Sequence, residues 1–148
     1  MTYTINFENG DPQVAQEVRD RLREFNQQFV APYTYNPLTL TVRNSEGELL
    51  GGCLGGVGMN WLNIDILWVR EDMRGKGLGR EVLRAMEAEG RRLGATSVVL
   101  DTFEFQAKGF YEKEGYAEYG RIEQFAPGFD RYYMWVRNAL WTESVAIR

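Results

Sequence analysis

Residues 69–80 read VREDMRGKGLGR, and this stretch decides how the chain folds. The residues before it, 61–69, are mostly apolar and end in Leu-Trp-Val, as expected for a β-strand. The residues after it, 77–93, carry apolar side chains at three- and four-residue spacing, which predicts an amphipathic helix. The stretch is therefore a glycine-rich basic turn that joins a strand to a helix.

This turn has the chemistry of an anion-binding loop. Glycines remove side chains where backbone N–H groups can converge, and a helix N-terminus adds unpaired donors and partial positive charge. The turn contains three glycines and three cations: Gly75, Gly77 and Gly79, and Arg74, Lys76 and Arg80. A polar turn with an exposed basic cluster is the alternative. The turn is not a Walker loop, because no Ser or Thr follows the lysine, and its glycine spacing differs from that of dinucleotide folds.

Strands and helices alternate along the rest of the chain. Strands are expected over residues 2–7, 38–43, 48–59, 61–69, 96–103, 116–125 and 131–138, and helices over residues 12–28, 77–93 and 105–113. This order predicts an α/β fold in which a mixed sheet carries helices on its faces. The length of 148 residues fits one domain spanning residues 1–148.

The composition excludes several kinds of chemistry. With no histidine and one cysteine (Cys53), the chain has no internal disulfide, structural zinc site or histidine-based catalytic triad. No apolar run approaches the ~20 residues of a membrane helix and no signal peptide is evident, so we expect no membrane contact and a cytoplasmic protein. The net charge of −4 argues against nucleic acid and favours a cationic small partner.

A second motif follows the basic turn. Residues 107–116 read AKGFYEKEGY, an alanine and a tyrosine separated by three residues and followed by glycine and an aromatic. Together with the turn, this segment resembles the GNAT superfamily of N-acetyltransferases. One departure is Glu104, which stands where the family often has an asparagine.

The resemblance implies a mostly antiparallel central sheet, splayed in the middle, and transfer of an acetyl group from acetyl-CoA to a primary amine without a metal. It implies that the pyrophosphate lies on the backbone of residues 74–80 and that the peptide-like arm lies beside residues 67–69. The implied cofactor-binding residues are Leu67, Trp68, Val69, Arg74, Gly75, Lys76, Gly77, Leu78, Gly79, Arg80, Gln106, Ala107 and Phe110.

Tyr111, in the second motif, is the candidate general acid. A phenol with a pKa of about 10 can protonate or hydrogen-bond the departing CoA thiolate. The alternative is a tyrosine that only packs between Phe110 and Tyr116.

Asp65 is the candidate general base. Strand alternation predicts one apolar face made of Leu62, Ile64, Ile66 and Trp68, and it places Asp65 on the other face. A carboxylate in a central strand is costly unless it is paired or solvated in a cleft. A structural aspartate is the alternative to a base, and Asp101 or a water molecule can replace Asp65 in the role.

The acceptor is expected to be a small cationic molecule, antibiotic-like or polyamine-like. Acetylation of a protein N-terminus or lysine, or CoA sensing without turnover, are the alternatives. The candidate acceptor-binding residues are Tyr33, Trp61, Asp101 and Glu104. A homodimer through the C-terminal residues 131–148, which include Trp135, Leu140 and Trp141, is possible.

Overall fold

The computed structural model describes residues 1–137 and divides into two compact units, Met1–Tyr33 and Thr34–Arg148. The first unit holds helix α1 (Pro12–Asn26), close to the expected 12–28. The Asp11 carboxylate accepts the N–H groups of Gln13 and Val14 and so caps this helix. The strand expected over residues 2–7 is wrong, since these residues form no strand. A β-strand needs a hydrogen-bonded neighbour, and sequence alternation alone supplies none.

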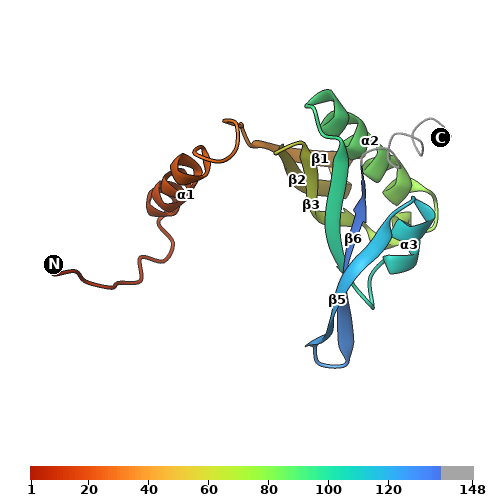
Figure 1. Cartoon of the computed structure of the whole chain (residues 1–148). Coiled ribbons are helices and arrows are strands. Elements are labelled where there is room, and N and C mark those ends of the chain that lie inside the picture. The colour runs from red at the N-terminus through yellow and green to blue at the C-terminus, as the bar shows by residue number, and fades with distance from the viewer. Residues whose placement is uncertain (138–148) are drawn as a thin grey trace. The chain divides into compact units, whose positions relative to one another are not determined.

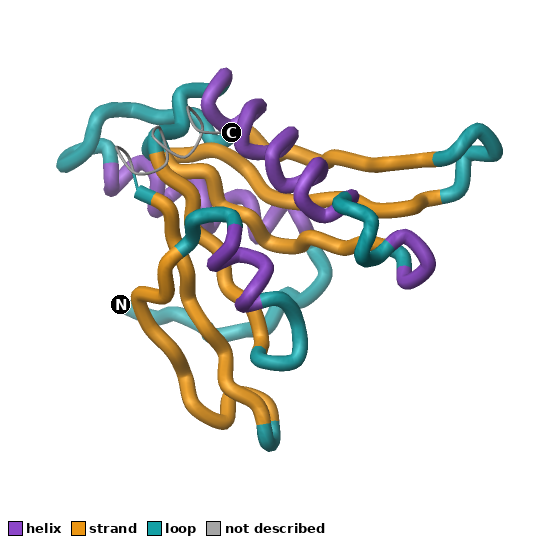
Figure 2. The backbone as a smooth tube through the Cα atoms, turned by 90° about the vertical axis from the view of Figure 1, so that its right-hand side faces the viewer, coloured by secondary structure: helices purple, strands orange, loops and turns teal. Residues whose placement is uncertain are grey.

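The second unit is built on a six-stranded sheet with the order β1-β2-β3-β4-β6-β5 (Figures 1 and 2). Its strands are β1 (Asn36–Arg43), β2 (Leu49–Gly58), β3 (Trp61–Val69), β4 (Ser97–Phe103), β5 (Ala117–Ala126) and β6 (Phe129–Val136). All neighbouring pairs are antiparallel except β3 and β4, which run parallel. The expected α/β class with a mixed sheet is confirmed. The expected last strand extended to Asn138, which lies outside the described residues.

Two helices and a short 3-10 turn follow the central strands: η1 (Glu71–Met73), α2 (Leu78–Arg92) and α3 (Lys108–Lys113). Helix α2 runs along the sheet over β2 and β3, as Figure 2 shows. Its residues Leu83 and Met86 are fully buried with Leu62 of β3 and Met134 of β6. The close approach of α2 to β3 favours a glycine, because a Cβ on Gly90 would lie 3.0 Å from Leu62 Cδ2 and would push that side chain aside.

The sheet splits between its two parallel strands. Strands β3 and β4 pair only from Trp61 to Ile64, opposite Ser97 to Leu100. Beyond these residues the strands separate, which agrees with the expected splay in the middle of the sheet. The split leaves the C-terminal half of β3 without a partner on its β4 side.

Candidate active site

A cavity of about 940 Å³ lies in the second unit where β3 and β4 separate. Its walls are the end of β3, the glycine-rich turn, the end of β4 and the first turns of α2 and α3. This volume is at the upper end of the range for small-molecule sites. All the expected cofactor-binding residues except Lys76 line it, and so do Tyr111, Asp65 and Asp101.

A β-bulge at Asp65 shapes the β3 wall. Leu54 of β2 pairs with Ile66, but the next residue, Gly55, pairs with Ile64, so Asp65 is the extra residue. The bulge reverses the alternation of side chains beyond it. The single apolar face expected on β3 is therefore wrong: Ile66 and Trp68 are 53% and 40% exposed, whereas Leu67 packs against the core.

The glycine-rich turn presents free backbone donors to the cavity. Gly75 and Gly77 have φ of 73° and 85°, in the left-handed region that favours glycine. A Cβ at either position would meet nothing within 4 Å. Gly77 is the N-cap of α2, and no side chain among residues 1–137 caps the first-turn N–H groups. These donors remain available to an anion.

The cations of the turn are only partly free. Arg80 Nε lies 3.1 Å from Oε1 of the buried Glu114, and Arg84 Nε lies 3.5 Å from its other oxygen. Arg74 Nε donates to the Val69 carbonyl over 3.1 Å. An anion at this turn would therefore be bound mainly by the oriented backbone N–H groups, and the charged side chains would contribute less.

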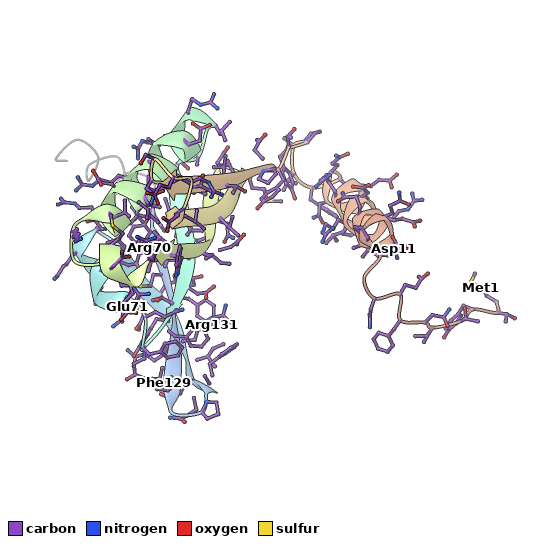
Figure 3. All side chains as sticks on the ribbon, turned by 180° about the vertical axis from the view of Figure 1, so that it is seen from behind. Met1, Asp11, Arg70, Glu71, Phe129 and Arg131 are labelled. Atoms are coloured by element: carbon purple, nitrogen blue, oxygen red, sulfur yellow. The ribbon has the colours of Figure 1, made fainter. Side chains whose placement is uncertain are left out.

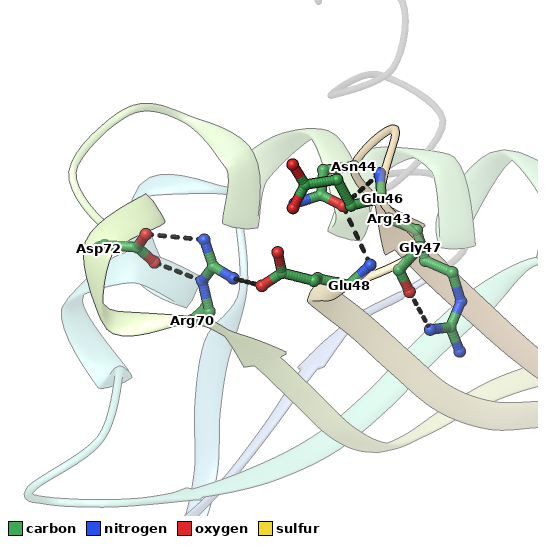
Figure 4. Close-up of polar contacts among 7 residues, drawn as sticks. All are labelled: Arg43, Asn44, Glu46, Gly47, Glu48, Arg70 and Asp72. Atoms are coloured by element: carbon green, nitrogen blue, oxygen red, sulfur yellow. Dashed lines mark hydrogen bonds and ion pairs between the residues drawn. The ribbon is translucent and has the colours of Figure 1, made fainter.

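Ion pairs anchor the start of the turn, as Figure 4 shows. Arg70 donates to both Asp72 oxygens over 2.6 and 2.7 Å and to Glu48 over 3.2 Å. The Asn44 side chain accepts the Glu48 N–H and so holds the neighbouring β1–β2 turn. The hydrogen bonds from Arg70 lower the pKa of the Asp72 carboxyl.

Two hydrogen bonds between side chains and the backbone fix the turn that follows β4. Gln106 Oε1 accepts the Phe103 N–H over 2.7 Å, and Thr102 Oγ1 accepts the Ala107 N–H over 3.3 Å. These bonds form a turn over residues 103–107, so α3 starts at Lys108 rather than at the expected residue 105. Thr102 is buried and was not among the residues chosen from the sequence, which gives no local signal for its contact.

Tyr111 is buried in α3 at the cavity wall, with its ring edge-on to Phe110 and Tyr116 at 5.1 and 5.7 Å. Burial, with smaller contributions from Cys53 and Asp101, raises the pKa of the Tyr111 phenol to about 12. The hydroxyl therefore keeps its proton at neutral pH and can donate it. Burial likewise raises the pKa of the Cys53 thiol to about 12, so this thiol stays protonated at neutral pH.

The two candidate carboxylates lie just beyond the last paired residues of β3 and β4. Asp65 is exposed and accepts a hydrogen bond from the Asn63 side chain. Asp101 is engaged by Arg131, whose Nε and Nη2 lie 2.9 and 2.8 Å from Oδ1. Arg131 was missed by sequence reasoning, because the pairing of β4 with β6 brings it from 30 residues away.

The remaining candidates lie elsewhere. Glu104 Oε2 accepts the Asp130 N–H over 3.2 Å, so it supports the β5–β6 hairpin and does not line the cavity. Trp61 packs 6.4 Å from Trp135 and is also outside the cavity lining. Tyr33 belongs to the first unit.

The part of the chain that the structure describes contains no cluster of three potential metal ligands. None of its helices is both long enough and apolar enough to cross a bilayer.

The model of the Acetyltransferase (GNAT) family matches residues 4–116, more than half of the chain. The chain belongs to the GNAT family. The GNAT chain is 31% identical to an acetyltransferase from Bacillus cereus of known crystal structure, with a TM-score of 0.78 over 92% of this chain and 99% of that one. Acetyltransferase Atu2258 of Agrobacterium fabrum is 29% identical over 119 residues, or 80% of this chain and 87% of that protein.

Blasticidin-S acetyltransferase of Streptomyces morookaense is 41% identical to the GNAT chain over 83 residues. The match covers 55% of this chain and 61% of that relative, which is less than two thirds of its length.

Tyr116, the final aromatic residue of the second GNAT motif, links two helices. The Tyr116 hydroxyl donates to Glu87 Oε2 over 2.8 Å, and both side chains are buried. This bond joins a residue three positions beyond the end of α3 to the middle of α2. The motif thus holds together the two helices that flank the cavity.

Proposed function

We propose that this protein transfers an acetyl group from acetyl-CoA to the primary amine of a small cationic molecule. One observation carries the proposal: the uncapped N–H groups at the start of α2 open into the cavity at the split between β3 and β4. Backbone donors at a helix N-terminus are suited to the pyrophosphate of a CoA ester.

The free edge of β3 supports the position of the peptide-like arm. Strand β2 pairs with Leu67, Trp68 and Val69 on one side, whereas β4 has already separated on the other. The backbone groups on that side can pair with an extended ligand as an added strand would. Gln106, Ala107 and Phe110 line the opposite wall.

Tyr111 would supply the proton for the leaving group. As the amine nitrogen attacks the thioester carbonyl and the C–S bond breaks, negative charge builds on sulfur and the Tyr111 hydroxyl donates to it. The raised pKa keeps this proton in place across the neutral range. General acid catalysis of this kind is worth about 10²- to 10⁴-fold.

Asp65 is the better placed of the two candidate bases. The substrate ammonium must lose a proton before its nitrogen can attack, and Asp65 can accept that proton directly or through a water. Arg131 Nε and Nη2 already contact Asp101 Oδ1, whereas Asp65 is exposed and bonded only to the Asn63 side chain among the contacts described.

A cationic acceptor fits the net charge of −4, and a small-molecule acceptor fits the similarity to blasticidin-S acetyltransferase. Carboxylates at the split attract a cation. The extent of the domain over residues 1–148, a cytoplasmic location, the lack of nucleic-acid binding and a homodimer stay predictions. Leu140 and Trp141, named for that dimer, lie outside the described residues.

The test is a thiol-release assay with acetyl-CoA and four acceptors: blasticidin S, spermidine, a peptide with a free N-terminus and a lysine, and no acceptor. We expect turnover with a small cation above the rate without acceptor. Turnover with the peptide alone would favour protein acetylation. Binding of acetyl-CoA without turnover of any acceptor would favour CoA sensing.

A further inference from the structure

Four phenylalanine rings form an exposed cluster beside the cavity, built from β4, the turn after it and the β5–β6 hairpin. The phenylalanine cluster comprises Phe103, Phe105, Phe125 and Phe129. Phe103 lies 5.2 Å from Phe105 and 5.6 Å from Phe125, and Phe105 lies 4.9 Å from Phe129, between ring centroids. Phe105, Phe125 and Phe129 are 58%, 47% and 41% exposed. A contiguous apolar patch of this kind on a folded chain indicates a binding surface.

Polar contacts hold the cluster in place. The Arg131 guanidinium stands 4.6 Å from the Phe125 ring centre and 5.5 Å from that of Phe103 while it binds Asp101. The Glu104 carboxylate and the Gln124 N–H both bind Asp130, which fixes the hairpin against the end of β4. Figure 3 shows Phe129 near the hairpin tip and Arg131 closer to the sheet. The rings are therefore arranged before any ligand arrives.

The phenylalanine cluster lies next to the proposed reaction site. Phe105 lines the cavity together with Asp101. Asp101 and Phe103 are two residues apart on β4, so they share one face of the strand and lie roughly 6.6 Å apart along it. An amine nitrogen held at the split would extend the rest of its molecule towards Phe103.

We propose that the phenylalanine cluster binds a planar aromatic ring of the acceptor, so that the substrate is an amine with a conjugated ring about three bonds or more from its nitrogen. This inference rests on the proposed acetyl transfer and specifies its substrate class. Phenyl rings prefer edge-to-face or offset contact with another ring and gain less from a saturated group of equal size. Asp65 would hold the ammonium end of such a molecule.

Two amines test the proposal because they differ only in the aromaticity of the ring: 3-phenylpropylamine and 3-cyclohexylpropylamine. We would measure the Kd of each for the full chain with CoA present, by calorimetry. The phenyl compound should bind about 2- to 10-fold more tightly. This readout is independent of turnover, so a failed thiol-release assay and a failed ring preference are separate results.

The matched variants are Phe125→Leu, which removes one ring, and Ile122→Ala, which trims an exposed apolar side chain of the same hairpin outside the ring contacts. Phe125→Leu should bring the ratio of the two Kd values towards 1, and Ile122→Ala should leave the ratio as it is in the wild type. Equal Kd values in the wild type, no binding of either amine, or a ratio unmoved by Phe125→Leu would overturn the proposal. A dimer in sedimentation velocity that Phe125→Leu dissociates would also overturn it, because the cluster would then be a subunit interface.

Discussion

The two parallel strands at the centre of the sheet end in opposite ways. After β3, the turn over residues 74–80 leaves the N–H groups at the start of α2 without a capping side chain from residues 1–137. After β4, the turn over residues 103–107 uses Gln106 and Thr102 to occupy the N–H groups of Phe103 and Ala107. Both turns line one cavity, and in the second turn the N–H groups of Phe103 and Ala107 are already engaged by side chains.

This difference indicates that the two turns have different roles in the cavity. We expect an anion to bind at the β3 turn, where glycine keeps side chains away from the backbone N–H groups. In the β4 turn, the bonded N–H groups of Phe103 and Ala107 fix the backbone that leads into α3 and so help to orient Tyr111.

The largest effect is expected on the β4 side, from Tyr111→Phe. The substitution keeps the ring and its edge contacts and removes only the proton donor. We expect kcat to fall about 10²- to 10⁴-fold, with little change in the Kd for acetyl-CoA. Single-turnover kinetics and calorimetry would measure the two quantities. A wild-type rate, where chemistry limits turnover, would leave Tyr111 with a packing role only.

On the β3 side, Gly77→Asp should weaken acetyl-CoA binding by about 100-fold or more, because it places a negative charge among donors that bind an anion. The matched control is Gly94→Asp, at the other end of α2. Gly77 and Gly94 have φ of +85° and +94°, and a Cβ at either would meet nothing within 4 Å. Backbone strain is therefore similar in the two variants. Equal affinities in both, measured by calorimetry, would place the anion site elsewhere.

Thr102→Val should act on stability instead. It keeps the side-chain shape but leaves the Ala107 N–H without its acceptor in a part-buried turn. We expect the free energy of unfolding to fall by about 1–3 kcal/mol in urea titrations, with acetyl-CoA affinity nearly unchanged. Thr41→Val, on the exposed side of β1, should change stability by less than about 0.5 kcal/mol. A Thr102→Val protein as stable as the control would mean that the β4 turn does not depend on this bond.

The smallest effect is expected from Asp72→Asn at the anchor of the β3 turn. Arg70 lowers the folded-state pKa of Asp72, so the stabilisation is present above the unfolded pKa of about 3.9 and is lost as pH falls through the lower folded value. The melting temperatures of wild type and variant should differ slightly at pH 7 and converge near pH 2. Because the pair is exposed, added salt should shrink the difference at pH 7. If the melting temperatures of wild type and variant still differed at pH 2, the ion pair between Arg70 and Asp72 would not be the source of the difference.

Local sequence signals predicted the part of the fold that carries the site. The junction from β3 to α2 was predicted to within one residue, since glycines and apolar spacing act over a few residues. Tyr111 lies in the short helix expected over residues 105–113, which the structure describes as α3.

The features that the sequence analysis missed or predicted wrongly share a physical cause. Each depends on a residue or strand that is distant in the sequence. The bulge at Asp65 exists only in the pairing of β3 with β2, so strand alternation could not predict it. The bond from Arg131 to Asp101 depends on β6 lying beside β4. Residues 2–7 alternate like a strand but have no pairing partner among the described residues.

The most direct test of the contrast between the two turns is an amide NMR titration of the ¹⁵N-labelled full chain with CoA. The N–H groups of Gly75, Gly77 and Gly79 should show large downfield shifts, as expected for new hydrogen bonds to phosphate. The N–H groups of Phe103 and Ala107 should show small shifts, because they are already bonded. Large shifts at Phe103 and Ala107 with unmoved glycines would contradict that contrast.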